Sequence, residues 1–228
     1  SQVLCEVAMD MLTSFFPPAF PALALSHFVA LLSPGPDFFL LMGYAIRYRL
    51  RGSVGLCVGI AAGNGLYIML AIIGWGVLRQ APLLFTVVEL LGAAYLLWIG
   101  SLLLRSRPTT LDVRSASASR PSRVKQLLLG LGSSLLNPKN ALFYLALMTS
   151  LLGPDVTLMQ QAVSGVWMIS IVLLWDLLLV TMIALPAVQR RLSTVVWRVE
   201  RAAGGVLMAF GCWIVWQFLH ESAVRLYA

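Results

Sequence analysis

Residues 33–37 read Ser-Pro-Gly-Pro-Asp, in the middle of an apolar stretch that runs from about residue 19 to residue 46. Two prolines and a glycine cannot continue an ordinary helix, because proline lacks an amide donor and glycine is a poor helix former. We therefore predict two half-helices, 19–32 and 38–46, about 21 and 13 Å long. Together they span roughly the 30 Å of a bilayer hydrocarbon core, so the break is expected at membrane depth.

A second interruption, Asn-Pro-Lys-Asn at residues 137–140, falls inside the apolar stretch 126–152. The flanking segments 126–136 and 141–152 are about 16 and 18 Å long as helices. Irregular backbone at membrane depth requires protein or a wet cavity to satisfy its polar groups, and transporters use such paired breaks to build binding sites. The alternative is a pair of proline kinks stabilised by neighbouring helices.

The composition is that of an integral membrane protein. Of the 228 residues, 60% are hydrophobic and 11% are charged, with a mean hydropathy of +0.88. The net charge of +7 alone would be compatible with nucleic-acid binding. Most basic residues, however, lie between apolar stretches, so we expect a lipid bilayer as the partner and no nucleic acid. The six expected transmembrane helices are 19–46, 53–77, 83–104, 126–152, 159–185 and 204–219.

Basic residues alternate between the expected loops. Three follow the first span, six follow the third and four follow the fifth, and these hold 13 of the 16 Lys and Arg residues. Because basic loops stay in the cytoplasm, we expect both termini on the periplasmic side. Attraction to anionic lipid head groups is a sufficient role for these side chains. They are Arg47, Arg49, Arg51, Arg105, Arg107, Arg114, Arg120, Arg123, Lys125, Arg190, Arg191, Arg198 and Arg201.

Each break lies in the first span of a three-span half. An odd number of spans per half makes the halves run oppositely through the membrane, so we predict an all-α membrane fold of two inverted three-helix repeats, with helices 1 and 4 broken at the midplane. The expected division is an N-terminal extension 1–18, a first repeat 19–104, a cytoplasmic linker 105–125, a second repeat 126–220 and a tail 221–228. The extension is given no function.

Three segments resemble the LysE/RhtB family of amino-acid exporters. Residues 27–39 (HFVALLSPGPDFF) look like its opening signature, 135–143 (LLNPKNALF) are similar to its second motif, and 92–100 (GAAYLLWIG) resemble its glycine-rich third helix. The first segment is closest to the threonine/homoserine exporter branch. The resemblance implies export of small neutral amino acids across the bacterial inner membrane, powered by proton antiport. Asn140 departs from the small residue of many members.

Asp37 and Lys139 are the principal candidates for substrate binding. Ionisable groups at the midplane are costly, and a zwitterionic amino acid needs a partner of each sign. We expect Ser33 and Asn137 to be N-caps, followed by a proline at the first helical position. The alternative is an Asp37–Lys139 salt bridge that binds no ligand. The other candidates in the two breaks are Pro34, Gly35, Pro36, Pro138 and Asn140.

Asp176, inside the fifth span, is the first candidate for proton coupling, because low-dielectric surroundings favour the protonated form of a carboxylate. Asp37 and His27 are further candidates, although a single intramembrane His is more often a hydrogen-bonded packing residue. Asn64 is a candidate cavity residue. Its neighbours Gly55, Gly59 and Gly63 at four-residue spacing first indicate a close helix contact.

Other function classes fit less well. The chain has no His-Glu-x-x-His, Gly-x-Ser-x-Gly or cysteine–histidine pattern, so we expect no enzyme, no catalytic residues, no cofactor and no resident metal. A channel, a structural membrane subunit, or an exporter of another small solute or metal cation remains an alternative. A homodimer is among the oligomeric states that the sequence leaves open.

The charge pattern makes a topology prediction. In a background without native cysteines, a cysteine at Ser106 should react with an impermeant reagent only from the cytoplasm, and one at Asp155 only from outside. Labelling of intact cells and of inverted vesicles measures this. The opposite result would exclude the predicted orientation.

Overall fold

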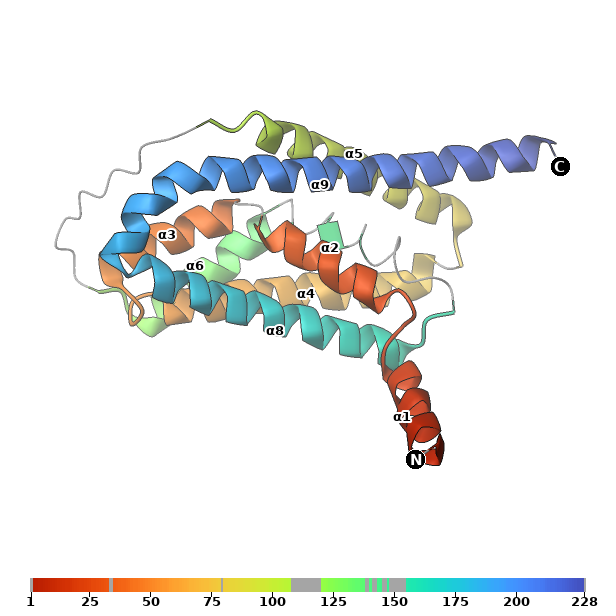
Figure 1. The fold of residues 1–228 in the computed structure, drawn as a ribbon, viewed down its shortest axis with the longest axis horizontal. Helices are drawn as coiled ribbons and strands as arrows, with labels where there is room; N and C mark the ends of the chain where they lie inside the picture. The colour runs from red at the N-terminus through yellow and green to blue at the C-terminus, as the bar shows by residue number, and fades with distance from the viewer. Residues whose placement is uncertain are drawn as a thin grey trace.

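The chain folds into long helices that lie mostly side by side (Figure 1). The computed structural model describes residues 2–32, 35–78, 80–107, 120–137, 140, 143–144, 147 and 155–227, and these contain no strand. The all-α prediction is therefore confirmed for the described chain. The helices are α1 (Gln2–Phe15), α2 (Phe20–Leu32), α3 (Pro36–Tyr48), α4 (Val54–Leu78), α5 (Pro82–Leu104), α6 (Arg123–Leu136), α8 (Leu158–Ile183) and α9 (Pro186–Tyr227).

The first predicted break is confirmed, but its cap differs. Helix α2 ends at Leu32, and α3 begins at Pro36 with Gly35 as its N-cap. The expectation that Ser33 caps this half-helix was wrong. The cause is Pro36, because a proline disfavours helical backbone in the preceding residue, and Gly35 is extended (φ −140°, ψ −167°). Ser33 and Pro34 themselves lie outside the described residues.

The second break also falls where the sequence predicts it. Helix α6 ends at Leu136, and Asn137 is its C-cap, with its backbone N–H donating to the Ser134 carbonyl at 3.3 Å. The Asn140 N–H donates to the Asn137 carbonyl at 3.1 Å, and Asn140 is helical again. Whether Asn137 also caps the following half-helix depends on Pro138 and Lys139, which lie outside the described residues.

The C-terminal helix is much longer than predicted. The expected span 204–219 lies inside α9, which runs unbroken for 42 residues, whereas α4, α5 and α8 match the predicted spans 53–77, 83–104 and 159–185 within two residues. The four arginines assigned to a loop after the fifth span lie on α9, so that loop assignment was wrong. The reason is that no proline follows Pro186, and isolated glycines weaken a helix by only about 1 kcal/mol each.

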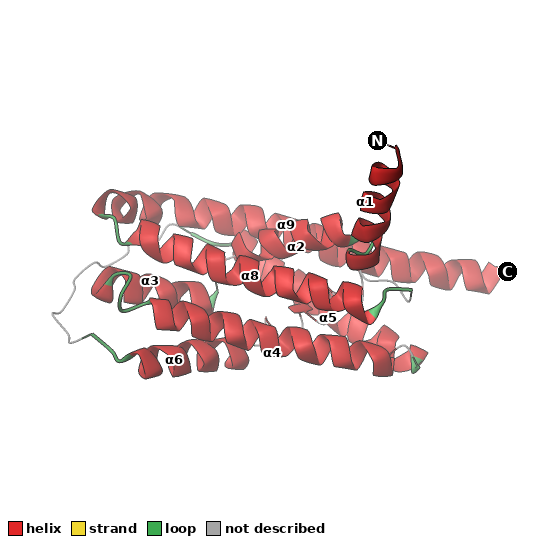
Figure 2. Ribbon diagram, turned by 90° about the horizontal axis from the view of Figure 1, so that it is seen from below, coloured by secondary structure: helices red, strands yellow, loops and turns green. Residues whose placement is uncertain are grey.

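Helices α4 and α6 are in backbone contact, as the glycine spacing predicts (Figure 2). A Cβ atom on Gly59 would lie 2.2 Å from the Leu127 carbonyl oxygen, and one on Gly130 would lie 2.3 Å from the Leu56 carbonyl oxygen. Only glycine fits at both positions. The contact brings the polar residues that follow Gly59 and Gly130 to the same depth in the bundle.

Around this pair, α8 packs against α2, α3 and α4, and α5 packs along α9 (Figure 1). Two helices among the described residues are long and apolar enough to cross a membrane, Val54–Gly74 within α4 and Leu158–Ile183. Helices α1 and α2 together make a third such segment, bent by 51°. The six-span count and the inverted repeat therefore stay predictions.

Two alanine substitutions on α6 test the backbone contact. Gly130→Ala should lower the thermal unfolding midpoint in detergent by several degrees, because overpacking typically costs about 1–3 kcal/mol. The matched control is Gly132→Ala, because a Cβ atom there meets no atom within 4 Å. Equal midpoints for the two variants would contradict the contact.

Candidate functional site

A cavity of about 60 Å³ lies where both helix breaks meet α4 and α8. This exceeds the roughly 10–15 Å³ that one water molecule needs. The lining combines apolar side chains such as Ile60 and Val172 with polar groups from five segments of the chain. The polar lining residues are His27, Asp37, Asn64, Asn137, Asn140, Tyr144, Trp175 and Asp176.

Asp37 connects the two breaks. It lies in the first turn of α3, where the helix dipole favours a negative charge. The Ser133 hydroxyl donates to its Oδ1 at 2.5 Å, and the Asn140 amide donates to its Oδ2 at 3.4 Å. Both oxygens of this carboxylate therefore already have donors, one from α6 and one from the segment after the second break.

Asn64 lies at the centre of the polar groups. Its Nδ2 donates to the Ile60 carbonyl at 2.8 Å and to the Ser134 hydroxyl at 3.1 Å. The Asn140 amide donates to the same hydroxyl at 3.1 Å and to the Ser134 carbonyl at 3.0 Å. Asn64 was only a minor candidate in the sequence-based prediction, yet the glycine contact between α4 and α6 brings it to Ser134.

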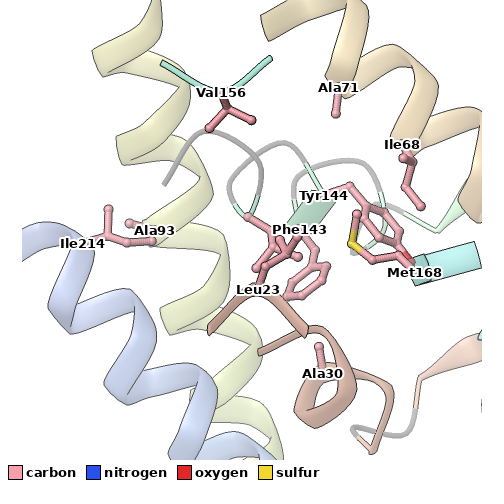
Figure 3. Close-up of a cluster of buried hydrophobic side chains, with 11 residues drawn as sticks. Leu23, Ala30, Ile68, Ala71, Ala93, Phe143, Tyr144, Val156, Met168 and Ile214 are labelled. Carbon is pink, nitrogen blue, oxygen red and sulfur yellow. The ribbon is translucent and has the colours of Figure 1, made fainter. Parts of the chain in front are cut away.

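Tyr144 was missed by the sequence-based prediction. Its hydroxyl donates to Asn64 Oδ1 at 2.6 Å and lies 3.1 Å from His27 Nε2. The ring packs among Leu23 and Met168 in a buried apolar cluster (Figure 3). Its spacing from Asn140 is one signal that could have revealed it, because residues four apart share a helix face.

Asp176 is buried on α8, with 6% of its surface exposed, and its Oδ2 has no hydrogen-bond partner among the described residues. Among the described residues, His27 Nδ1 and Trp175 Nε1 also lack a hydrogen-bond partner. His27 is 1% exposed. Buried polar atoms are seldom left unpaired, so this side of the cavity differs from the satisfied network around Asp37.

The structure thus gathers seven of the predicted site residues around one cavity. These are His27, Gly35, Asp37, Asn64, Asn137, Asn140 and Asp176. Pro36 begins α3. Ser33, Pro34, Pro138 and Lys139 lie outside the described residues, and with Lys139 the predicted pairing to Asp37. No three His, Cys, Asp or Glu side chains of the described ranges are grouped so that they could hold a metal ion.

Comparison with known proteins decides the family. The family model for the LysE type translocator matches residues 28–217, which include both breaks and every residue of the cavity lining except His27. The chain belongs to the LysE type translocator family. With its apolar helices α4 and α8, this LysE type translocator is a membrane protein, and its family is one of transporters.

Several curated proteins are similar in sequence to this LysE type translocator. The threonine efflux protein of Escherichia coli K12 is 28% identical over 86% of this chain and 97% of its own length. An uncharacterized membrane protein of Haemophilus influenzae is 29% identical over 87% and 97%. The leucine efflux protein of Klebsiella pneumoniae is 34% identical over 51% and 55%. No solved structure matches the chain.

Removing the Tyr144 hydroxyl should destabilise the protein. Tyr144→Phe leaves Asn64 Oδ1 and His27 Nε2 unpaired, and each buried polar group left without a partner costs about 1–3 kcal/mol. Thermal unfolding in detergent measures the loss. The control is Tyr227→Phe, since Tyr227 is 94% exposed. An unchanged midpoint for Tyr144→Phe would contradict the network.

Proposed function

We propose that this chain is a secondary transporter that exports small neutral amino acids across the bacterial inner membrane by proton antiport. The names of its relatives support amino-acid efflux, since the proteins of similar length include threonine efflux proteins and a shorter match is a leucine efflux protein. The basic residue pattern supports periplasmic termini.

The observation that carries the proposal is a cavity that is lined by two carboxylates, one buried and one half-buried, and lies between two helix breaks. Asp37 and Asp176 supply the negative charge that an ammonium group requires. Amide groups of Asn137 and Asn140 line the same space, and Lys139 follows in the same break. We assign the substrate carboxylate to this break and the proton to Asp176, with His27 and Asp37 as further proton sites.

Helix contacts support the two inverted halves, 19–104 and 126–220. Equivalent spans of the two halves pack on each other, α5 on α9 and α4 on α8. The second span of each half also packs against the broken span of the other half, α4 against α6 and α8 against α2 and α3. A two-fold axis in the membrane plane would produce such a pattern, and this kind of arrangement lets a midplane site open to either side.

Transport in proteoliposomes tests this function. With an imposed proton gradient, radiolabelled threonine or leucine should move against its own concentration gradient, and a protonophore should abolish the uphill flux. A channel would pass the amino acid only downhill. Absence of any flux of either amino acid would contradict the proposal.

A bulky side chain in the cavity should block this flux. Ile60 lines the cavity and is 2% exposed, so Ile60→Trp should reduce uptake at least tenfold in protein that still elutes as a single folded species. Val58→Trp is the matched control on the same helix, because Val58 is 41% exposed on its outer surface. Equal flux through both variants would place the route elsewhere.

A further inference from the structure

The hydrogen-bond chain through Tyr144 runs in one direction only. A carbonyl oxygen accepts and cannot donate, so the Ile60 carbonyl fixes the Asn64 amide with its Nδ2 toward Ile60. The Asn64 Oδ1 therefore faces Tyr144, and the Tyr144 hydroxyl must donate to it at 2.6 Å. The single hydroxyl proton of Tyr144 is committed to this bond.

This direction sets the tautomer of His27. Because the Tyr144 oxygen has already given its proton to Asn64, it can only accept from His27 Nε2, which lies 3.1 Å away. A neutral imidazole that carries its proton on Nε2 has a bare Nδ1, which is an acceptor. His27 is 1% exposed, and this Nδ1 has no partner among the described residues.

Asp176 presents a second open acceptor at the same cavity. Its Oδ2 lacks a partner in the described chain, whereas both oxygens of Asp37 receive donors from Ser133 and Asn140. A buried carboxylate without a counter-charge is costly, so the group requires a cation or a proton. An ammonium group, with three N–H donors and a positive charge, suits a cavity whose lining includes an unpartnered carboxylate oxygen and an unpartnered imidazole nitrogen.

We propose that Asp176, and not Asp37, receives the ammonium group of the exported amino acid, and that a proton competes with it for the same carboxylate. The inference rests on the proposed function. When the ammonium binds, the Asp176 proton leaves to the side from which the substrate entered, and the ammonium keeps all its own protons. One carboxylate cannot bind the ammonium group and the proton at once, so each change of the site from one side of the membrane to the other carries either the amino acid or the proton.

Other titratable groups surround Asp176 on the elements that pack against α8. They are His27 on α2, Asp37 on α3, Cys57 on α4 and Tyr144 after the second break, whereas none of the titratable side chains that the structure describes on α1 or α9 lines the cavity. Asp37 adds negative charge to the cavity but is held by its own donors. Proton uptake by His27 would also repel the ammonium, so His27 and Asp176 are substituted separately to distinguish their effects.

Competition predicts how binding depends on pH. In purified protein, the apparent Kd for radiolabelled threonine or leucine should rise as the pH is lowered from 8 to 5, approaching tenfold per unit once Asp176 holds its proton. Over this range the amino acid stays a zwitterion, so the change belongs to the protein. In weakly buffered solution, substrate binding should release up to one proton per bound molecule, which an indicator dye records.

Substitutions assign the proton. Asp176→Asn should abolish substrate binding, proton release, uphill export and substrate-for-substrate exchange together. Asp176→Glu should keep pH-dependent binding and proton release. In His27→Gln, proton release should persist, because Asp176 is unchanged. Asp155→Asn is the control, since Asp155 is an exposed carboxylate in the turn before α8.

Each alternative has its own outcome. If Asp176→Asn keeps exchange and loses only uphill export, Asp176 carries the proton alone and the inference is wrong. Loss of proton release in Asp37→Asn but not in Asp176→Asn would assign the ammonium to Asp37. If Asp176→Asn does not fold, wild-type binding without proton release still overturns the inference. Wild-type protein that neither binds nor transports threonine or leucine would refute the proposed function itself.

Discussion

The close approach of α4 and α6 is the constraint on which the rest of the site depends. Gly59 and Gly130 face the backbone of the opposite helix at distances that no side chain would allow. One turn further along, this proximity brings the Asn64 amide to the Ser134 hydroxyl. Ser133, the next residue on α6, donates to Asp37. A wider spacing between the two helices would break these bonds, because a side-chain contact of about 3.6 Å is no longer a hydrogen bond.

The polar groups of the cavity fall into two sets that differ in their hydrogen bonding. Asn64, Ser134, Asn140 and Asp37 satisfy one another and therefore hold the two breaks in a fixed relation. By contrast, His27 Nδ1 and Asp176 Oδ2 have no hydrogen-bond partner among the described residues. A fully hydrogen-bonded network is rigid, so it can hold these two acceptor atoms in position without forming hydrogen bonds to them. This division is typical of a preorganised binding site, in which the supporting residues are bonded to one another and the residues that bind the ligand keep unpartnered polar atoms.

Features coded by neighbouring residues could be predicted from the sequence, and features that depend on distant pairing could not. The two breaks follow from two prolines and a glycine at residues 33–36 and from one proline at residues 137–140, and the helix contact follows from glycines at four-residue spacing. The Tyr144 bonds join positions 80 and 117 residues apart, and nothing in the sequence around Tyr144 indicates its partners. The arginines at the start of α9 misled the prediction, because basic residues mark a membrane surface whether the backbone there is a loop or a helix.

The unbroken helix α9 is longer than the hydrocarbon core of a bilayer is thick. At 1.5 Å per residue its 42 residues extend about 63 Å, twice the hydrocarbon thickness of roughly 30 Å. The Arg201 side chain also donates to the Ser106 carbonyl, two residues beyond the end of α5, and lies 4.8 Å from the Trp197 ring centroid, so α5 and α9 are joined at their arginine-bearing end. Helices α2 and α8, which carry His27 and Asp176, also pack against α9. The joined pair of α5 and α9 therefore forms one edge of the bundle, on which two of the helices that line the cavity rest.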